Sequence, residues 1–262
     1  MPFIERYVTV PKGTGARHRL KVRPWQRQII GGVLDDPRPR QALVSIPAGN
    51  GKSTLAAALG LYGLLGGRVE GARVLVVASD ERQARIILTT AARMVELDDD
   101  LSARVQVFKH HLLEPRTASV FMALSADPGA LQGWDPSLAI VDELHVVNAD
   151  TYEAMAARAG KREHSLLLAI STPPKAGQDD SVMRRLVDHG RASNDPSFYF
   201  AEFAARPAAR STTSRRGQSP IRPSTTASTA TPSGPPSRRR CGRPRSGGTG
   251  SASGSSRRCM AT

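Results

Sequence analysis

The sequence predicts an α/β domain in which helices cover both faces of a mainly parallel sheet. Apolar, strand-like runs alternate with segments of helical period along residues 1–205, as in a sheet built from strand–helix–strand units. The run Arg73–Ala78 is too apolar for a strand with one face in water. A glycine-rich loop joins the first strand to a helical segment. Together these observations indicate a sheet buried between two helical layers.

The elements are predicted from hydrophobic period and from turn residues. Pro24 can open the first helix, because its fixed φ suits the first helical position, and Trp25, Ile29 and Ile30 supply an apolar side. The predicted strands are 42–46, 73–78, 105–108, 119–124, 138–141, 166–170 and 199–203. The other predicted helices are 52–65, 80–97, 151–159 and 181–189. Residues 1–205 are therefore expected to form one globular domain.

Residues 206–262 differ in composition from the rest of the chain. They contain no Asp, Glu, Lys or aromatic residue and hold 12 arginines, so only +2 of the formal +14 charge belongs to residues 1–205. Such a segment is either a disordered basic arm that contacts nucleic-acid phosphates or GC-rich DNA translated in the wrong frame. We interpret 206–262 as a disordered tail of out-of-frame sequence.

Cysteine content and hydropathy indicate the cellular compartment expected for the protein. Both cysteines, Cys241 and Cys259, lie in 206–262, so the predicted domain has no thiol for a disulfide or a metal site. No apolar run approaches the roughly 20 residues that a membrane helix needs. The polar start of the chain lacks the apolar core of a signal peptide. We therefore expect a soluble cytoplasmic protein without membrane contact.

The loop between the first strand and its helix carries the strongest chemical signal. Its residues are Gly49, Asn50, Gly51, Lys52, Ser53 and Thr54. Glycines let successive N–H groups point to one centre, and the following helix adds its positive end, so the loop suits a nucleotide phosphate. Lys52 would reach the β- and γ-phosphates of ATP, and the Ser53 hydroxyl would bind Mg²⁺. Ile46 stands where the usual pattern has glycine, and an ordinary glycine turn is the alternative.

A second signal is the strand 138–141, which leads into the adjacent carboxylates Asp142 and Glu143. Because side chains alternate along a strand, one carboxylate can face the metal and the next the attacking water. Asp142 would hold Mg²⁺, and Glu143 would polarise the water that attacks the γ-phosphate. A helix N-cap is the alternative, but the phosphate loop some 90 residues earlier favours catalysis. The pair predicts a P-loop NTPase of the ASCE, RecA-like type.

Two hydroxyl residues, Ser171 and Thr172, follow the strand 166–170. At the tip of such a strand a hydroxyl can sense hydrolysis and pass it to a moving element. A plain turn before proline is the alternative. His145 is either a neighbour of the γ-phosphate or of this coupling element, or a surface histidine.

Trp25 and Gln26 precede the phosphate loop. A glutamine amide offers a donor and an acceptor, which suits the edge of adenine, and an aromatic neighbour can pack on the base or the ribose. A core tryptophan beside an exposed glutamine is the alternative. The position ahead of the loop favours nucleotide binding.

Taken in order, these residues resemble the ATPase domain of the large terminase subunit of tailed bacteriophages. The resemblance covers residues 18–205 and rests on Pro24–Gln26, Pro47–Ser53, Gly133–Ser137 with Val141–His145, and Ser171–Pro173. It implies a phage or prophage motor that hydrolyses ATP to drive double-stranded DNA into a capsid in the bacterial host cytoplasm. It also implies a small terminase subunit and a portal ring as partners, and a homo-oligomeric ring as the active form.

The resemblance also implies roles for single residues. Gln26 would read adenine, Lys52 and Glu143 would act in catalysis, and Ser171 and Thr172 would form the coupling motif. Ser53 and Asp142 would be the Mg²⁺ contacts.

The chain departs from this family in two ways. Terminases often have an arginine in the loop near Ala48 that acts on the γ-phosphate, so an arginine finger is needed from elsewhere, in the same or a neighbouring subunit. Arg158 and Arg162 are the candidates. No carboxylate follows Glu202, so the metal-dependent nuclease domain of the family is expected to be missing from this truncated or frameshifted chain.

Two other functions stay open at this stage. Asp142–His145 also fits the strand end of a DExH helicase-like, DNA-dependent ATPase. Such motors use a second RecA-like domain, for which the last 57 residues leave no room. The other alternative is a non-catalytic, truncated fragment that binds nucleotide or DNA without turnover.

Overall fold

The computed structural model describes residues 2–67, 69–127, 129, 131, 133–159, 162, 165–173, 181–205 and 221–223. The predicted tail 206–262 therefore lies outside the described residues, apart from the short strand 221–223.

A nine-stranded sheet organises the described part of the chain, in the order β3-β4-β5-β2-β6-β7-β1-β8-β9. The strands are β1 (Gln41–Ser45), β2 (Arg73–Ala78), β3 (Gln106–Val107), β4 (His111–Glu114), β5 (Ser119–Ser125), β6 (Leu138–Asp142), β7 (Leu166–Ser171), β8 (Phe198–Ala205) and β9 (Ile221–Pro223). The central strands from β5 to β8 run parallel, and antiparallel pairing adds β3, β4 and β9 at the two ends. The expected mainly parallel sheet is confirmed.

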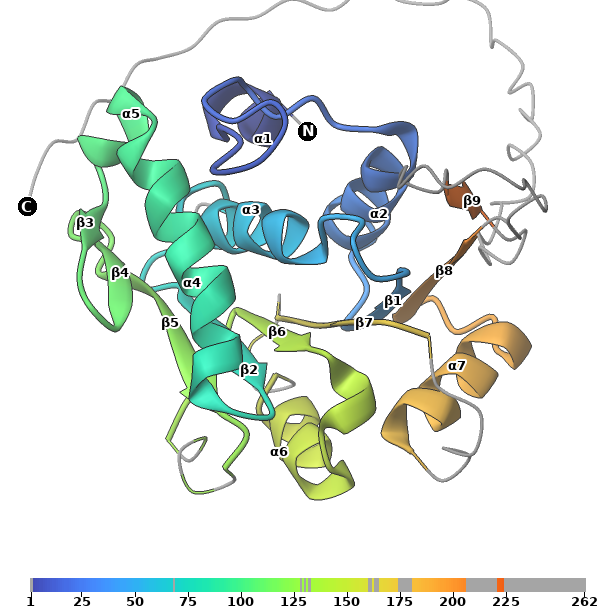
Figure 1. The fold of residues 1–262 in the computed structure, drawn as a ribbon. Coiled ribbons are helices and arrows are strands. Elements are labelled where there is room, and N and C mark those ends of the chain that lie inside the picture. Colours follow the sequence, from blue (N-terminus) through green and yellow to red (C-terminus); the bar gives the residue numbers. More distant parts are fainter. Residues whose placement is uncertain are drawn as a thin grey trace, which may run out of the picture. The chain divides into compact units, whose positions relative to one another are not determined.

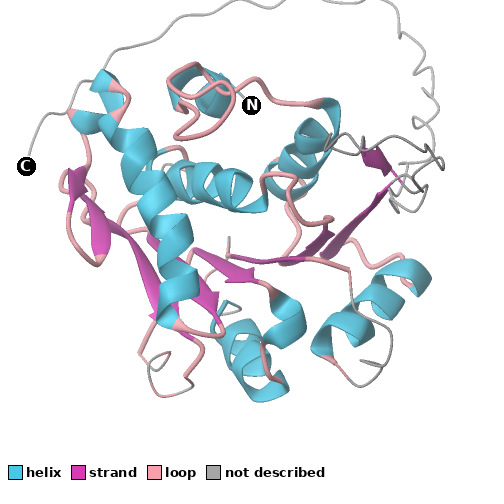
Figure 2. Ribbon diagram, viewed as in Figure 1, coloured by secondary structure: helices cyan, strands magenta, loops and turns pink. Residues whose placement is uncertain are grey.

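Helices lie on both faces of this sheet (Figure 1). They are α1 (Pro2–Tyr7), α2 (Pro24–Leu34), α3 (Lys52–Leu65), α4 (Glu81–Glu96), α5 (Asp99–Ser102), the 3₁₀ turn η1 (Leu144–Val146), α6 (Ala149–Ala159) and α7 (Val182–Ala192). Figure 2 shows α3 and α4 on one side of the strands and α6 and α7 on the other. None of the helices among the described residues has both the length and the apolar character needed to cross a bilayer.

Two apolar clusters hold these layers together. Alternate residues of β2 enter different clusters: Val74 and Val76 pack with α3 and α4, whereas Leu75 and Val77 pack with α6 and α7. All four side chains are buried, which is why this strand reads as a continuous apolar run. The sheet is thus a central layer with a core on each face.

Several parts of the fold differ from the sequence-based expectation, among them α5, η1 and β9, none of which was predicted. The predicted strand 105–108 is only Gln106–Val107, and it pairs with β4, which was not predicted. β4 carries polar ends at His111 and Glu114, and this hides its strand character. The N-terminal lead contains α1, which was also not predicted, and its Ile4 is buried. Six residues are too few to show a helical period.

Candidate nucleotide-binding site

The phosphate loop follows β1 and ends at α3. Gly49 and Gly51 adopt φ values of 79° and 78°, in the left-handed region that favours glycine. Asn50 closes the loop on itself, because its Nδ2 donates to the carbonyl oxygens of Pro47 and Ala48 at 3.1 and 3.3 Å. α3 begins at Lys52, so its unpaired N–H groups lie at the loop. The local geometry is that of an anion-binding turn.

The strand ends beside the loop are adjacent, because β6, β7 and β1 are neighbours in the sheet. The backbone joins them: Glu143 N–H donates to the Ile170 carbonyl, and Ile46 N–H donates to the Ser171 carbonyl, both at 2.9 Å. The carboxyl ends of parallel strands share one edge. The residues predicted from three separate segments therefore meet at this edge.

Asp142 ends β6 and is only 2% exposed. Burial raises its pKa to about 6, and the nearby charge of Glu143 adds to this rise. Gln83 Nε2 donates to Asp142 Oδ2 at 3.4 Å, which with the charge of Lys52 partly offsets the shift. A buried carboxylate that resists ionisation is a residue whose charge a bound cation would stabilise.

Glu143 has a left-handed backbone, with φ 50° and ψ 51°, which is uncommon for a residue with a side chain. It precedes η1, but its side chain makes no capping hydrogen bond, so the N-cap alternative does not explain the side chain. Oε1 lies 3.4 Å from Lys52 Nζ. The lysine is 9% exposed, so this ion pair lies largely away from water.

The predicted coupling residues lie next to Glu143. Ser171 is fully buried at the end of β7, and its Oγ accepts from the His145 N–H at 3.3 Å. Thr172 Oγ1 donates to Glu143 Oε2 at 3.4 Å. His145 Nδ1 lies 3.2 Å from the same oxygen. His145 therefore contacts both Glu143 and the predicted coupling residue Ser171.

An open cavity of about 400 Å³ lies at this edge of the sheet. Its lining residues are Ser79, Asp80, Gln83, Glu143, His145, Val146 and Thr172. Sequence reasoning missed Gln83. A signal was present, since Asp80 and Gln83 have the spacing of a helix-capping pair, and Asp80 Oδ1 accepts from the Gln83 N–H at 3.0 Å. That spacing places Gln83 at the carboxyl end of β2, beside β6.

Trp25 and Gln26 lie in the first turn of α2. The Trp25 ring packs 5.7 Å from the ring of Phe203. Gln26 is buried, contrary to the exposed glutamine of the alternative, and its Oε1 accepts from the Arg23 N–H at 2.9 Å. The amide oxygen therefore caps α2, and the amide nitrogen is the group that would meet a base.

Arg158 and Arg162 both make hydrogen bonds to residues outside the phosphate loop. Arg158 Nε donates to the Leu131 carbonyl at 2.6 Å. Arg162 pairs with Asp135 at 2.8 Å and reaches the Gly71 carbonyl at 3.4 Å. Gly71 precedes β2, so Arg162 lies at the amino edge of the strands, opposite the phosphate loop. In this arrangement Arg162 does not reach the cleft of its own chain.

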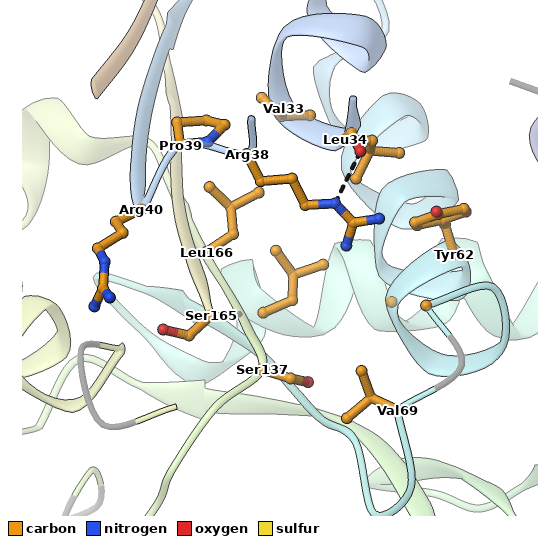
Figure 3. Close-up of a pocket in the computed structure, with 13 residues that line it drawn as sticks. Val33, Leu34, Arg38, Pro39, Arg40, Tyr62, Val69, Ser137, Ser165 and Leu166 are labelled. Atoms are coloured by element: carbon orange, nitrogen blue, oxygen red, sulfur yellow. Dashed lines mark hydrogen bonds between the residues drawn. The ribbon is translucent and has the colours of Figure 1, made fainter. Parts of the chain in front are cut away.

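A second pocket lies at the amino edge, near the starts of β6 and β7 (Figure 3). Arg38 extends across it, with Nε donating to the Leu34 carbonyl at 2.9 Å, whereas Arg40 points away. Val33, Tyr62 and Leu166 supply much of its apolar lining. None of the predicted site residues lines this pocket.

A divalent cation fits the donor set at the carboxyl edge. The described residues contain no group of three His, Cys, Asp or Glu side chains that could hold a metal ion. Mg²⁺ does not require one, because it is usually bound by one or two carboxylates together with substrate phosphates and water. The Asp142 carboxylate and the Ser53 hydroxyl are hard oxygen donors of this kind.

The parallel sheet, the glycine loop before a buried helix and the carboxylates at the end of β6, separated from β1 by β7, define the P-loop class of nucleotide-binding domains. Comparison with known proteins then gives the family. The model of the "Terminase large subunit, ATPase domain" matches residues 24–186, and the chain belongs to this family. This favours the terminase prediction over the helicase-like alternative.

Two curated relatives are phage proteins. The chain is 31% identical to the terminase large subunit of Enterobacteria phage HK97 over 201 residues, which are 74% of this chain and 40% of that protein. It is 25% identical to the terminase large subunit of Lactococcus phage SK1 over 203 residues, 71% of this chain and 38% of that protein. The chain thus spans about 40% of the length of these relatives.

Solved structures agree. The HK97 bacteriophage large terminase matches with a TM-score of 0.70 at 30% identity, over 79% of this chain and 43% of that one. The large terminase of a thermophilic bacteriophage matches with a TM-score of 0.54 at 12% identity, over 69% of this chain and 44% of that one, a likeness of fold alone.

Proposed function

We propose that this domain hydrolyses ATP with Mg²⁺ at the carboxyl edge of its sheet, as the motor domain of a phage terminase large subunit. The observation that carries the proposal is the 3.4 Å contact between Lys52 Nζ and Glu143 Oε1. It joins the predicted phosphate-binding lysine to the predicted catalytic carboxylate, and Asp142 directly precedes Glu143 in the chain.

In this proposal the residues of the phosphate loop have different roles, which depend on their chemical groups. N–H groups of Gly49, Asn50 and Gly51 and of the first turn of α3 surround the phosphates, with Ser53 and Thr54 hydroxyls beside them. Lys52 turns from Glu143 to the β- and γ-phosphates. Ser53 and Asp142 hold Mg²⁺, which when bound neutralises charge on the phosphates.

Glu143 orients and polarises the water that attacks the γ-phosphate. The carboxylate is held beside the loop on a strand end, and water positioning of this kind is a main contribution of protein to phosphoryl transfer. Gln26 contacts adenine through its amide nitrogen, because its oxygen accepts from Arg23. Trp25 packs near the base or the ribose.

Membership of the terminase family supports the following proposal for the larger assembly. Ser171 and Thr172 transmit the hydrolysis state to elements that move double-stranded DNA. The partners are a small terminase subunit and a portal ring, and the active form is a homo-oligomeric ring in the bacterial host cytoplasm. An arginine finger, Arg158 or Arg162, acts on the site of a neighbouring subunit.

The decisive experiment is a steady-state ATPase assay with and without double-stranded DNA, alongside ATP binding by calorimetry. Glu143→Gln is expected to lower kcat by about 100-fold or more while ATP still binds, because it removes the group that activates water. Lys52→Ala is expected to weaken ATP binding as well. Glu96→Gln is a matched control, since Glu96 pairs with Arg93 at the far end of α4.

Two results would overturn the proposal. If wild type and Glu143→Gln bind ATP equally and turn over at the same rate, the chain is a nucleotide-binding fragment without catalysis. If neither binds ATP, the phosphate-loop assignment fails too.

A further inference from the structure

His145 contacts two elements of the site through one atom. Its Nδ1 lies 3.2 Å from Glu143 Oε2 and 3.1 Å from Ser171 Oγ. Thr172 Oγ1 is 3.4 Å from the same nitrogen. The side chain is 13% exposed and that of Glu143 is 24% exposed, so both lie mostly below the surface at the edge of the cavity.

Ser171 connects His145 to the sheet. Its Oγ accepts from the His145 backbone N–H, and its carbonyl accepts from the Ile46 N–H at the start of the phosphate loop. The hydroxyl is fully buried at the end of β7. A displacement of β7 relative to β1 would therefore move Ser171 Oγ, which is hydrogen-bonded to the His145 imidazole.

The two oxygens of Glu143 have different partners. Oε1 faces Lys52, whereas Oε2 faces His145 and Thr172. The proposed function moves Lys52 to the phosphates of ATP. His145 and Thr172 are then the described side chains that still hold the carboxylate.

We propose that His145 is a positioning residue that fixes the Glu143 carboxylate through Nδ1 and ties it to β7 through Ser171. This inference rests on the proposed ATP hydrolysis. Nδ1–H is shared by two acceptors, Glu143 Oε2 and Ser171 Oγ, so the ring links the carboxylate to the end of β7. The Glu143 carboxylate keeps its orientation when Lys52 moves away, and the position of the end of β7 determines that orientation.

The test compares three variants of His145. Asparagine carries its amide on the same Cγ as Nδ1 and can place a donor there, whereas glutamine places its amide one bond farther out. His145→Asn is expected to retain most of the wild-type kcat. His145→Gln and His145→Ala are expected to lose about 10- to 100-fold in kcat with little change in the KM for ATP, since misplacing a catalytic group acts on turnover.

Several outcomes would overturn the inference. A purely structural histidine would make Asn and Gln equally good or bad, or would shift the thermal melting midpoint together with kcat. His189→Asn, on α7, is the control for a histidine that packs on a ring, Phe198, outside the cleft.

A double-mutant cycle supplies an independent measurement. The effects of His145→Ala and Ser171→Ala on log kcat should be clearly less than additive, because both variants break one chain of contacts. Full additivity overturns the tie to β7. An active wild type with tolerant His145 variants overturns only this inference, whereas a wild type equal to Glu143→Gln overturns the proposed function and this inference with it.

Discussion

At the scale of single residues, the site concentrates features that cost stability. Asp142 is a buried carboxylate, and Glu143 adopts a left-handed backbone without being glycine. Such features persist where the surrounding structure fixes them, and they cluster at functional sites. Here the neighbouring strands and the Ile170 carbonyl fix both residues.

Asp142→Asn is expected to raise the stability of the nucleotide-free protein near neutral pH. The folded pKa of Asp142 is raised from 3.8 to about 6, by burial first and by Glu143 second. Between these values the folded state holds more protons than the unfolded state, so stability from this group is full below 3.8 and lost as pH rises through 6. Asparagine stays neutral throughout.

Thermal melts from pH 4 to pH 8 test this expectation. The variant should melt above wild type at pH 8, and the difference should shrink toward about pH 4, where the wild-type carboxyl is protonated too. A constant difference across this range would contradict the raised pKa. The same variant should lose Mg²⁺-dependent ATPase activity.

At the scale of elements, α3 carries the loop and is packed tightly against the sheet. Its buried residues continue around the helix, among them Leu55, Leu59 and Leu61. A Cβ built on Gly60 would lie 2.4 Å from the Phe121 ring. This glycine permits the close approach of α3, the helix that follows the phosphate loop, to β5.

Gly60→Ala is therefore expected to destabilise the domain. Overpacking typically costs about 1–3 kcal/mol, and the gain in helix propensity offsets about 1 kcal/mol of this. Because Phe121 is fully buried and the approach is as short as 2.4 Å, we expect a net loss of about 1–2 kcal/mol. Urea unfolding measures it. Gly67→Ala is the matched control, because its Cβ would meet nothing closer than 3.8 Å. Equal stability of the two variants would show that Phe121 moves aside freely.

Sequence patterns predicted the helices and strands better than they predicted contacts between side chains. The bounds of α3 and β2 were predicted to the residue, because one is a long apolar helix and the other a continuous β-rich run. The 3₁₀ turn after Glu143 was not predicted, since it depends on a backbone conformation that the residue type disfavours. The capping pattern at Asp80 locates Gln83 after β2, but the contact of Gln83 with Asp142 depends on the strand order that puts β2 beside β6.

At the scale of the whole molecule, the two edges of the sheet differ in content. The carboxyl edge holds the phosphate loop, Glu143 and Ser171, whereas the amino edge holds Arg162 with Asp135. In the arrangement described, a finger at the amino edge would act on a site of another subunit. The proposed ring is therefore part of the proposed catalysis.

Mixing two inactive variants tests this arrangement. Glu143→Gln subunits keep Arg162 but lack the carboxylate, and Arg162→Ala subunits keep the carboxylate but lack the finger. In a mixed ring on DNA, ATPase activity should exceed that of either variant alone, because one subunit supplies what its neighbour lacks. Unchanged activity in every mixture would argue against Arg162 as a finger in trans. The same design with Arg158→Ala tests the other candidate.

The ion pair of Lys52 with Glu143 has a consequence for the order of events. While the ammonium group faces the carboxylate, one of its oxygens is engaged and is not offered to water. An arriving triphosphate competes for the same ammonium, and as it wins Lys52 it releases that oxygen. Under the proposed function, ATP binding thus frees the Glu143 oxygen for the attacking water, and without ATP this oxygen stays paired with Lys52.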